Sequence, residues 1–197
     1  MDEIAPPTSP ARWCLRLTPL ALIGLTIGVL FAMGRPGIST CGTIALWHGE
    51  INTAEDSQQI ADWYSFTHII HGFLLYWILW LCSKKVAFLR PTWNRFTVAV
   101  LLESAWEILE NTPFIINRYR EATIALGYHG DSVINSTCDI LFMSLGFLLA
   151  MRFPVWMVIG LAFAFELTSL FVIRDNLTLN VLMLLFPVDA IHQWQMG

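Results

Sequence analysis

The stretch F-T-V-A-V-L-L-E-S-A-W-E-I-L-E-N, from Phe96 to Asn111, decides the class of fold because it combines a long apolar run with three carboxylates. The run continues to Ile116, and a helix that crosses a bilayer needs about 20 predominantly apolar residues. A charge at mid-bilayer costs about 2.5 to 3.5 kcal/mol, so intramembrane carboxylates are rare and usually functional. Steps of four and three residues place Glu103, Glu107 and Glu110 on one helical stripe, which must face protein, water or a cation.

Composition extends this interpretation to the whole chain. Hydrophobic residues make up 56% of the 197 residues and charged residues 13%, and the mean hydropathy is +0.59. A soluble domain of this size carries about 25% charged residues. A bilayer admits only helices and closed barrels, and these apolar runs are too long for barrel strands. The sequence therefore predicts an all-α, polytopic transmembrane helix bundle.

Five apolar runs predict membrane spans: Leu15–Met33, Ser65–Cys82, Phe96–Ile116, Val133–Met151 and Val155–Ile173. The last run, Leu177–Phe186, has only 10 residues before Pro187. Such a run is too short to cross, so it is either a tilted sixth span extended to about His192 or a re-entrant segment. We expect five to six spans and favour six, in a single domain over residues 15–197. A tail over residues 1–14 precedes this domain, and a loop over about 34–64 is exported.

Lys and Arg placement gives the orientation. With a cytoplasmic N-terminus, alternating spans put 7 of the 11 Lys and Arg residues inside and 4 outside. This bias agrees with the excess of positive charge that cytoplasmic loops carry. Six spans would place both termini in the cytoplasm.

In this topology the polar residues of the spans converge in the outer half of the bilayer or at its surface. The inner half is almost purely apolar apart from Glu103. The converging residues are His68, His71, Glu107, Glu110, Asn111, Asp131, Asn135, Asp139, Glu166, Arg174, Asp175, Asn176 and Asn180.

The histidines and carboxylates are candidate metal ligands. His68 and His71 are three residues apart on one helical face, which suits two imidazoles on one ion or a proton-shuttling pair. With Glu107 and Asp139 they offer the N and O ligands that Zn or a similar divalent ion takes. The structural alternative is that the histidines bond neighbouring helices and that protonated carboxyls join helices by hydrogen bonds.

Two further motifs have both a functional and a structural interpretation. Asp131, Asn135 and Asp139 are spaced by four residues on one face, but Asp131 or Ser132 is also a natural helix N-cap. Gly146 follows on nearly the same face, so a helix can pack tightly below Asp139.

Near the last apolar run, Arg174 could bind an anionic head group, with Asn176 and Asn180 as neutral donors. The alternative is an interfacial turn in which Asp175 or Asn176 caps the last helix.

Several function classes lack support. The chain has no G-x-S-x-G, H-E-x-x-H, Walker or E-x-x-H motif. A net charge of -4 without a basic stripe argues against nucleic-acid binding.

The polar motifs also carry a resemblance. D-W-Y-S-F-T-H-I-I-H-G-F-L-L-Y (62–76), E-S-A-W-E-I-L-E-N-T-P-F-I-I-N-R-Y-R (103–120), G-D-S-V-I-N-S-T-C-D (130–139) and I-R-D-N-L-T-L-N (173–180) resemble a proteobacterial family of small multi-pass inner-membrane proteins of unknown function. More distantly, their order is similar to that in YjdF-type and VanZ-like membrane proteins. The resemblance implies topology and location in the cell inner membrane, and it implies no reaction.

Three functional hypotheses follow, and the sequence does not decide whether the protein is an enzyme. The first is a metal-dependent enzyme acting on a lipid or lipid-linked phosphate, with Glu103 or Glu110 as general base and Arg174 orienting the phosphate. The second is an accessory subunit that stabilises a larger complex of membrane proteins, for which Gly24 and Gly28 offer a packing face. The third is an ion-coupled or proton-coupled carrier, which the lack of internal repeats disfavours.

Overall fold

All regular secondary structure is helical in the part that the computed structural model describes, residues 10–51, 53–125 and 127–197, where the chain has no strand. This confirms the all-α prediction. The elements are α1 (Pro10–Ala32), α2 (Ser65–Ser83), the short 3-10 helix η1 (Ala87–Leu89), α3 (Thr92–Glu110), α4 (Pro113–Ala122), α5 (Val133–Arg152), α6 (Val155–Ile173), α7 (Leu177–Leu185) and α8 (Asp189–Met196).

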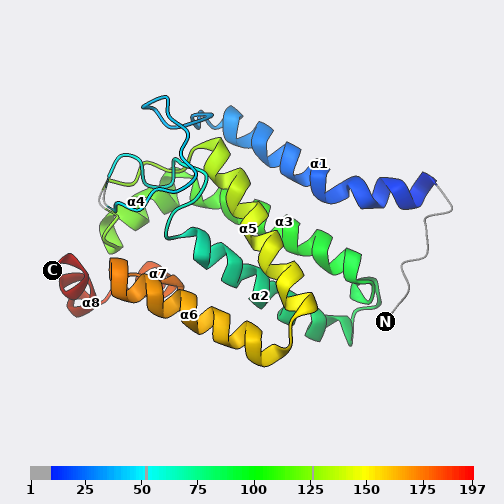
Figure 1. The fold of residues 1–197 in the computed structure, drawn as a ribbon. Helices are drawn as coiled ribbons and strands as arrows, with labels where there is room; N and C mark the ends of the chain where they lie inside the picture. Colours follow the sequence, from blue (N-terminus) through cyan, green and yellow to red (C-terminus); the bar gives the residue numbers. More distant parts are fainter. Residues whose placement is uncertain (1–9, 52, 126) are drawn as a thin grey trace.

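The long helices run back and forth between two ends of the molecule (Figure 1). The α2–α3 and α5–α6 connections lie at one end, and the loop before α2, α4 and α8 lie at the other. Within the described residues, α2, α5 and α6 are long and apolar enough to cross a membrane. Their outer surfaces are apolar, with Val155 74% and Phe171 80% exposed. Exposed apolar faces of this length indicate membrane association.

Two glycines set the closest helix contact, between α2 and α5. A Cβ atom on Gly72 would lie 2.1 Å from the carbonyl oxygen of Met143, and one on Gly146 would lie 2.0 Å from that of Ile69. The two backbones therefore touch where only glycine fits, as small residues allow in membrane helices. This contact lies two turns along α5 from Asp139, as the position of Gly146 predicted. Gly24 and Gly28 differ, because no described atom lies within 4 Å of a Cβ on either.

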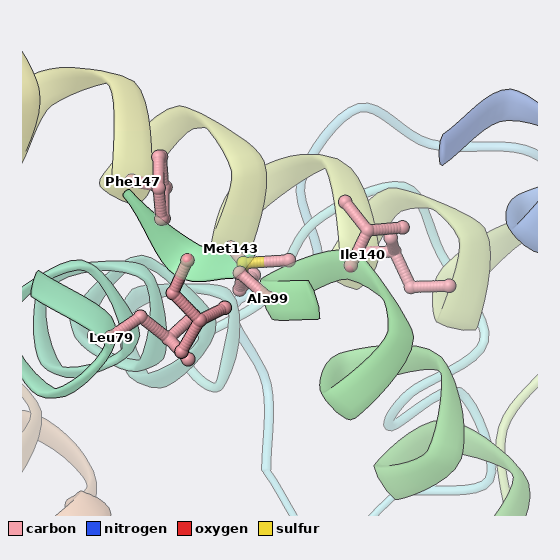
Figure 2. Packing of buried hydrophobic residues seen from close by; sticks show 7 residues of the cluster. Leu79, Ala99, Ile140, Met143 and Phe147 are labelled. Carbon is pink, nitrogen blue, oxygen red and sulfur yellow. The ribbon is translucent and has the colours of Figure 1, made fainter. Parts of the chain in front are cut away.

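A hydrophobic core next to this contact joins α2, α3 and α5. Leu79, Ala99, Ile140, Met143 and Phe147 point toward one another from these three helices (Figure 2). Met143 and Phe147 are fully buried. Together with Val100 and Leu89, this cluster fills the half of the bundle nearer the α2–α3 connection.

The predicted third span is shorter than expected. α3 ends at Glu110, and a new helix, α4, begins at Pro113 instead of continuing to Ile116. Proline has no N–H for the helix ladder and pushes the residue before it into extended conformation. Thr112 accordingly has ψ 151°, so the chain turns here.

The last apolar run also differs from the favoured prediction of a sixth span. α7 has nine residues, which is about 14 Å of helix against a hydrocarbon core of about 30 Å. The helix ends before Pro187, and α8 begins at Asp189. Gln195 of α8 donates to the carbonyl of Arg174, just after α6. The C-terminal helix therefore lies at the opposite end of the bundle from the start of α1, not at the same end (Figure 1).

Candidate functional site

A cavity of about 400 Å³ opens beside α2, α3 and α7. Its wall is polar toward the end that holds α4 and apolar toward the middle of the bundle. The lining residues are Ser57, Tyr64, Thr67, His68, His71, Leu74, Leu75, Ile78, Leu102, Glu103, Trp106, Glu110, Tyr119, Ala125, Tyr128, Asp131, Asp139, Leu177, Asn180, Val181 and Leu184.

Both histidines of α2 face one carboxylate of α3. Nδ1 of His68 lies 2.7 Å from Oε1 of Glu103, and Nδ1 of His71 lies 3.0 Å from the same oxygen. Spacing of three residues puts both imidazoles on one face of α2, so one carboxylate can accept from both. Glu103, which the sequence placed apart from the other polar residues, thus has two histidine partners.

Two more carboxylates surround His68. Oε1 of Glu107 lies 3.6 Å from its Nδ1, and Oδ2 of Asp139 lies 3.8 Å from its Nε2. Glu107 is completely buried, and neither of its oxygens has a hydrogen-bond partner among the described residues. Oδ1 of Asp139 likewise has no partner within the described ranges. A buried carboxylate without donors needs a proton or a cation.

Glu110 lies one turn further along α3, on the same cavity wall. Its carboxyl interacts with the Tyr119 hydroxyl and the Trp106 indole. The structure thus brings together the five predicted residues with ionisable side chains on α2 and α3, namely His68, His71, Glu103, Glu107 and Glu110, and it adds Asp139 from α5.

Asn111 and Asp131 form a structural link between α3 and the segment before α5. The Asn111 amide donates to Oδ2 of Asp131 at 2.8 Å, and the Asp131 backbone N–H donates back to Oδ1 of Asn111. Tyr128 donates to the other carboxylate oxygen at 2.8 Å. Burial raises the pKa of Asp131 in spite of these donors. These hydrogen bonds join the end of α3 to the residues just before α5, across the segment that contains α4.

Asn135 and Ser132 anchor the start of α5. The Ser132 hydroxyl accepts from the backbone N–H of Asn135, so Ser132 is the N-cap. The Asn135 amide donates to the carbonyl of Gln59 at 2.9 Å. Asn135 therefore ties the loop before α2 to α5 and does not line the cavity.

Glu166 and Asn176 hold α7 in place. The Glu166 carboxylate accepts from the backbone N–H groups of Leu177 and Thr178, which are free donors at the start of α7. The Asn176 side chain accepts from the N–H of Leu179 and is the N-cap. Asn180 reaches the cavity, where it accepts from the Tyr119 hydroxyl at 3.2 Å.

Arg174 and Asp175 lie outside the cavity wall. The Arg174 guanidinium donates to the carbonyl of Trp194 at 3.2 Å and is exposed. Asp175 is buried and accepts from the Tyr64 hydroxyl and the Gln195 amide. Burial raises the pKa of Asp175 to about 6. Neither residue joins the cluster around His68.

Sequence reasoning missed the aromatic part of the wall. Tyr64, Trp106, Tyr119 and Tyr128 line the cavity and surround its carboxylates. With 13% aromatic residues in the chain, no local pattern separated these side chains from the aromatic residues on the outer surface of the bundle. Only their positions next to predicted polar residues offered a signal.

The histidine pair fits a divalent metal ion. The centres of its two rings are 5.1 Å apart, and bonds of about 2.0 to 2.1 Å at a tetrahedral ion place two imidazole centres about 5 Å apart. Two groups have ligand atoms within 4.8 Å of one another, His68 with His71 and Glu103, and His68 with Glu107 and Glu110. The site can therefore hold a cation with small side-chain movements.

Comparisons with known proteins identify the family. The model of the family described as "Protein of unknown function (DUF2585)" matches residues 30–197. A UPF0314 protein of Sphingopyxis alaskensis is 54% identical over 182 residues, which cover 92% of this chain and 94% of that protein. One of Novosphingobium aromaticivorans is 52% identical over 196 residues, covering 94% of this chain and 98% of its own length.

No solved structure matches the chain significantly. These matches agree with the predicted resemblance to an uncharacterised proteobacterial family, and they do not bear on the more distant one to YjdF-type and VanZ-like proteins. On the strength of the match over most of its length, the chain belongs to the DUF2585 family.

Proposed function

We propose that the protein is a multi-pass inner-membrane enzyme that binds a divalent metal ion in the cavity and acts on a lipid or lipid-linked substrate. One observation carries the proposal. His68 and His71 line the cavity, and next to His68 the carboxyl of Glu107 and one oxygen of Asp139 are buried without a donor among the described residues. A cation balances this excess of buried negative charge, and imidazole with carboxylate is a ligand set of Zn and similar ions.

The hydrogen bonds to Glu103 favour particular ligand atoms. A histidine that donates Nδ1–H to a carboxylate presents Nε2 to a metal, and such carboxylates orient many metal-bound histidines. Nε2 of His68 lies 3.8 Å from Oδ2 of Asp139, close to the separation of two ligands on one ion. We therefore assign His68 and Asp139 as ligands and Glu103 as the residue that positions both histidines. We add His71 as a third ligand that reaches the ion by turning its ring, since His71 and Asp139 do not share one of the close groups.

Glu107 and Glu110 take other roles in this proposal. Glu107 approaches the Nδ1 side of His68, away from Asp139, so we place it beside the ion and not among its ligands. Glu110 lines the cavity next to Trp106, where it can accept a proton from a bound substrate or water. We propose no role for Arg174 in the chemistry, because its guanidinium bonds the C-terminal helix.

The topology that goes with this function has five crossings, α1, α2, α3, α5 and α6, and α7 as a re-entrant helix. The cavity then opens toward the outer leaflet. A carrier would need a path through the other half of the bundle, where buried side chains such as Met143 and Phe147 form an apolar core. Arg95 and Ser144 are buried polar residues in that half. Arg95 is bonded to the carbonyls of Leu89 and Arg90, however, and forms no continuous polar path with the cavity residues in the described part of the chain, which favours an enzyme over a carrier.

Metal content tests the proposal. The protein is purified in nanodiscs and analysed for bound elements, as the wild type and as Asp139→Asn, Glu103→Gln and the control Asp189→Asn, whose side chain is exposed on α8. We expect about one ion per chain in the wild type and control, none in Asp139→Asn, and a 10- to 100-fold weaker affinity in Glu103→Gln. Equal metal content in wild type and Asp139→Asn would rule out the assigned site.

Lipid analysis tests the enzymatic part. Cells that produce the wild type are compared with cells that produce equal amounts of Asp139→Asn. We expect at least one lipid species to change in abundance between them. Identical lipid profiles, with metal bound only to the wild type, would point to the accessory-subunit role instead.

A further inference from the structure

We propose that the cavity selects an amphiphile whose head group donates hydrogen bonds and carries no negative charge, such as an alcohol, a sugar or an ammonium group. The proposal rests on the cavity of the proposed function and narrows its substrate class. It departs from the expectation of a lipid-linked phosphate held by Arg174.

The charges of the cavity exclude an anionic head group. Four carboxyl groups line it, Glu103, Glu110, Asp131 and Asp139, and the lining contains no lysine or arginine in the described part of the chain. Arg35 interacts electrostatically with Asp131, but it does not line the cavity. The proposed divalent ion offsets only two of these four charges, so a phosphate would still meet like charge across a partly desolvated site, where repulsion is stronger than in water.

The hydrogen bonds of the wall point the same way. The hydroxyl protons of the three lining tyrosines are used by protein acceptors: Tyr128 donates to Asp131, Tyr119 to Asn180 and Tyr64 to Asp175. The wall therefore offers a ligand mainly hydrogen-bond acceptors. One of them is Oδ1 of Asp139, which has no partner among the described residues. A wall of acceptors recognises donors, which are hydroxyl or ammonium groups.

Aromatic rings at the same end fit these head groups. Trp106, Tyr119 and Tyr128 line the polar part of the cavity, and the ring centres of the two tyrosines are 5.3 Å apart. Aromatic faces attract cations, and they also pack against the apolar faces of neutral groups.

The apolar wall accounts for the rest of the ligand. Leu74 and Ile78 of α2, Leu102 of α3 and Val181 of α7 line the cavity, and their side chains are 44, 44, 47 and 45% exposed. These residues lie on helices whose exposed apolar faces meet lipid in the proposed topology. An acyl or prenyl chain can therefore leave the cavity sideways while its head group stays among the carboxylates.

Photo-crosslinking tests the proposal on the intact chain. Three probes share one long alkyl chain with a diazirine and differ only in head group: alcohol, ammonium or phosphate monoester. Each is added at equal amounts to phosphatidylcholine nanodiscs that hold the protein, with and without a metal chelator. Labelling of the peptides that contain Leu102 and Val181 is measured by mass spectrometry, relative to labelling around Phe171 on the outer face of α6.

We expect the alcohol probe, the ammonium probe or both to label the cavity at least about fivefold more than the phosphate probe, and the stronger of the two identifies the head group. Leu102→Trp and Val181→Trp should each abolish this excess by filling the cavity, and Phe171→Trp should leave it unchanged. Val181→Arg should raise labelling by the phosphate probe.

Phosphate labelling equal to or above the other two, or no excess in the cavity for any probe, would overturn the proposal. The chelator separates this result from the proposed function. A head-group preference that persists without metal supports the cavity's selectivity even if the protein proves to hold no ion.

Discussion

Asp175 joins three elements through one buried carboxylate. It follows α6, accepts from Tyr64 just before α2, and accepts from Gln195 of α8. Burial raises its pKa to about 6 from an ordinary 3.8. The folded protein therefore binds this proton more tightly than the unfolded chain. The carboxyl's contribution to stability is most favourable below pH 4 and is lost as pH rises from about 4 to 6.

Asp175→Asn should remove this pH dependence, because asparagine mimics the protonated carboxyl and keeps an acceptor for Tyr64. As pH rises from 4.5 to 7, the wild type should lose melting temperature relative to the variant by on the order of 5 °C. Above pH 7 the difference between the two melting temperatures should stay constant. Thermal unfolding in nanodiscs across this range measures it. A difference that does not vary with pH would show that Asp175 keeps an ordinary pKa.

Which residues of the site lie together could be predicted where their spacing in the sequence alone puts them on one face of a helix. The separation of His68 and His71 by three residues placed both imidazoles together, and the structure has both on Glu103. The choice of Glu103 as their partner was not predictable. It depends on how far α3 is rotated and shifted against α2, and that is set by packing between helices distant in sequence.

Two pairs of glycines have different surroundings, one between packed helices and one on an exposed helix face. Gly72 and Gly146 sit where α2 and α5 touch, and Gly24 and Gly28 lie on an exposed face of α1 with open space around them in the described structure. The same residue type thus serves close packing in one place and not in the other. The sequence pointed to Gly24 and Gly28 as well as to Gly146, because spacing alone cannot tell which face meets another helix.

Alanine substitutions should separate these pairs. Gly72→Ala or Gly146→Ala places a methyl group against backbone carbonyls that cannot move alone, so we expect a loss of about 1 to 3 kcal/mol or more and a melting temperature lower by roughly 3 to 10 °C. Gly28→Ala is the matched control and should be neutral or slightly stabilising, since alanine favours helix. Equal effects at Gly72 and Gly28 would contradict the close α2–α5 contact.

Element boundaries were predictable where proline or a cap marks them. Pro113 and Pro187 each mark a helix end in the structure, and both were visible in the sequence. The third predicted span nevertheless ran past Asn111, and one of the two alternatives for the last run extended it to about His192, because apolar residues follow Pro113 and Pro187. α7 is held by Glu166, which is 11 residues before Leu177 on another helix, and a contact of that kind has no local signal.

One end of the molecule carries a group of basic residues, and four other basic residues, Arg35, Arg118, Arg120 and Arg174, lie toward the opposite end. Lys84, Lys85, Arg90 and Arg152 lie in or next to the α2–α3 and α5–α6 connections at one end (Figure 1). The other end holds the acidic loop before α2 and the polar side of the cavity. Positive charge favours the cytoplasmic side, so the proposed orientation places the group around Lys84 and Lys85 in the cytoplasm and turns the cavity outward, and this orientation stays a prediction.

Reporter fusions test the five-crossing topology. The C-terminal helix packs on the residues after α6, at the end opposite to Lys84 and Lys85, so we expect Gly197 to be exported. Alkaline phosphatase, which is active only after export, should be active when fused after Gly197, and a green fluorescent protein fused there should be dark. Insertion beside Lys85 is the control and should give the reverse pattern. Fluorescence at Gly197 would mean that residues 177–192 cross the membrane, and α7 would then have to lengthen beyond the nine residues that the fold gives it.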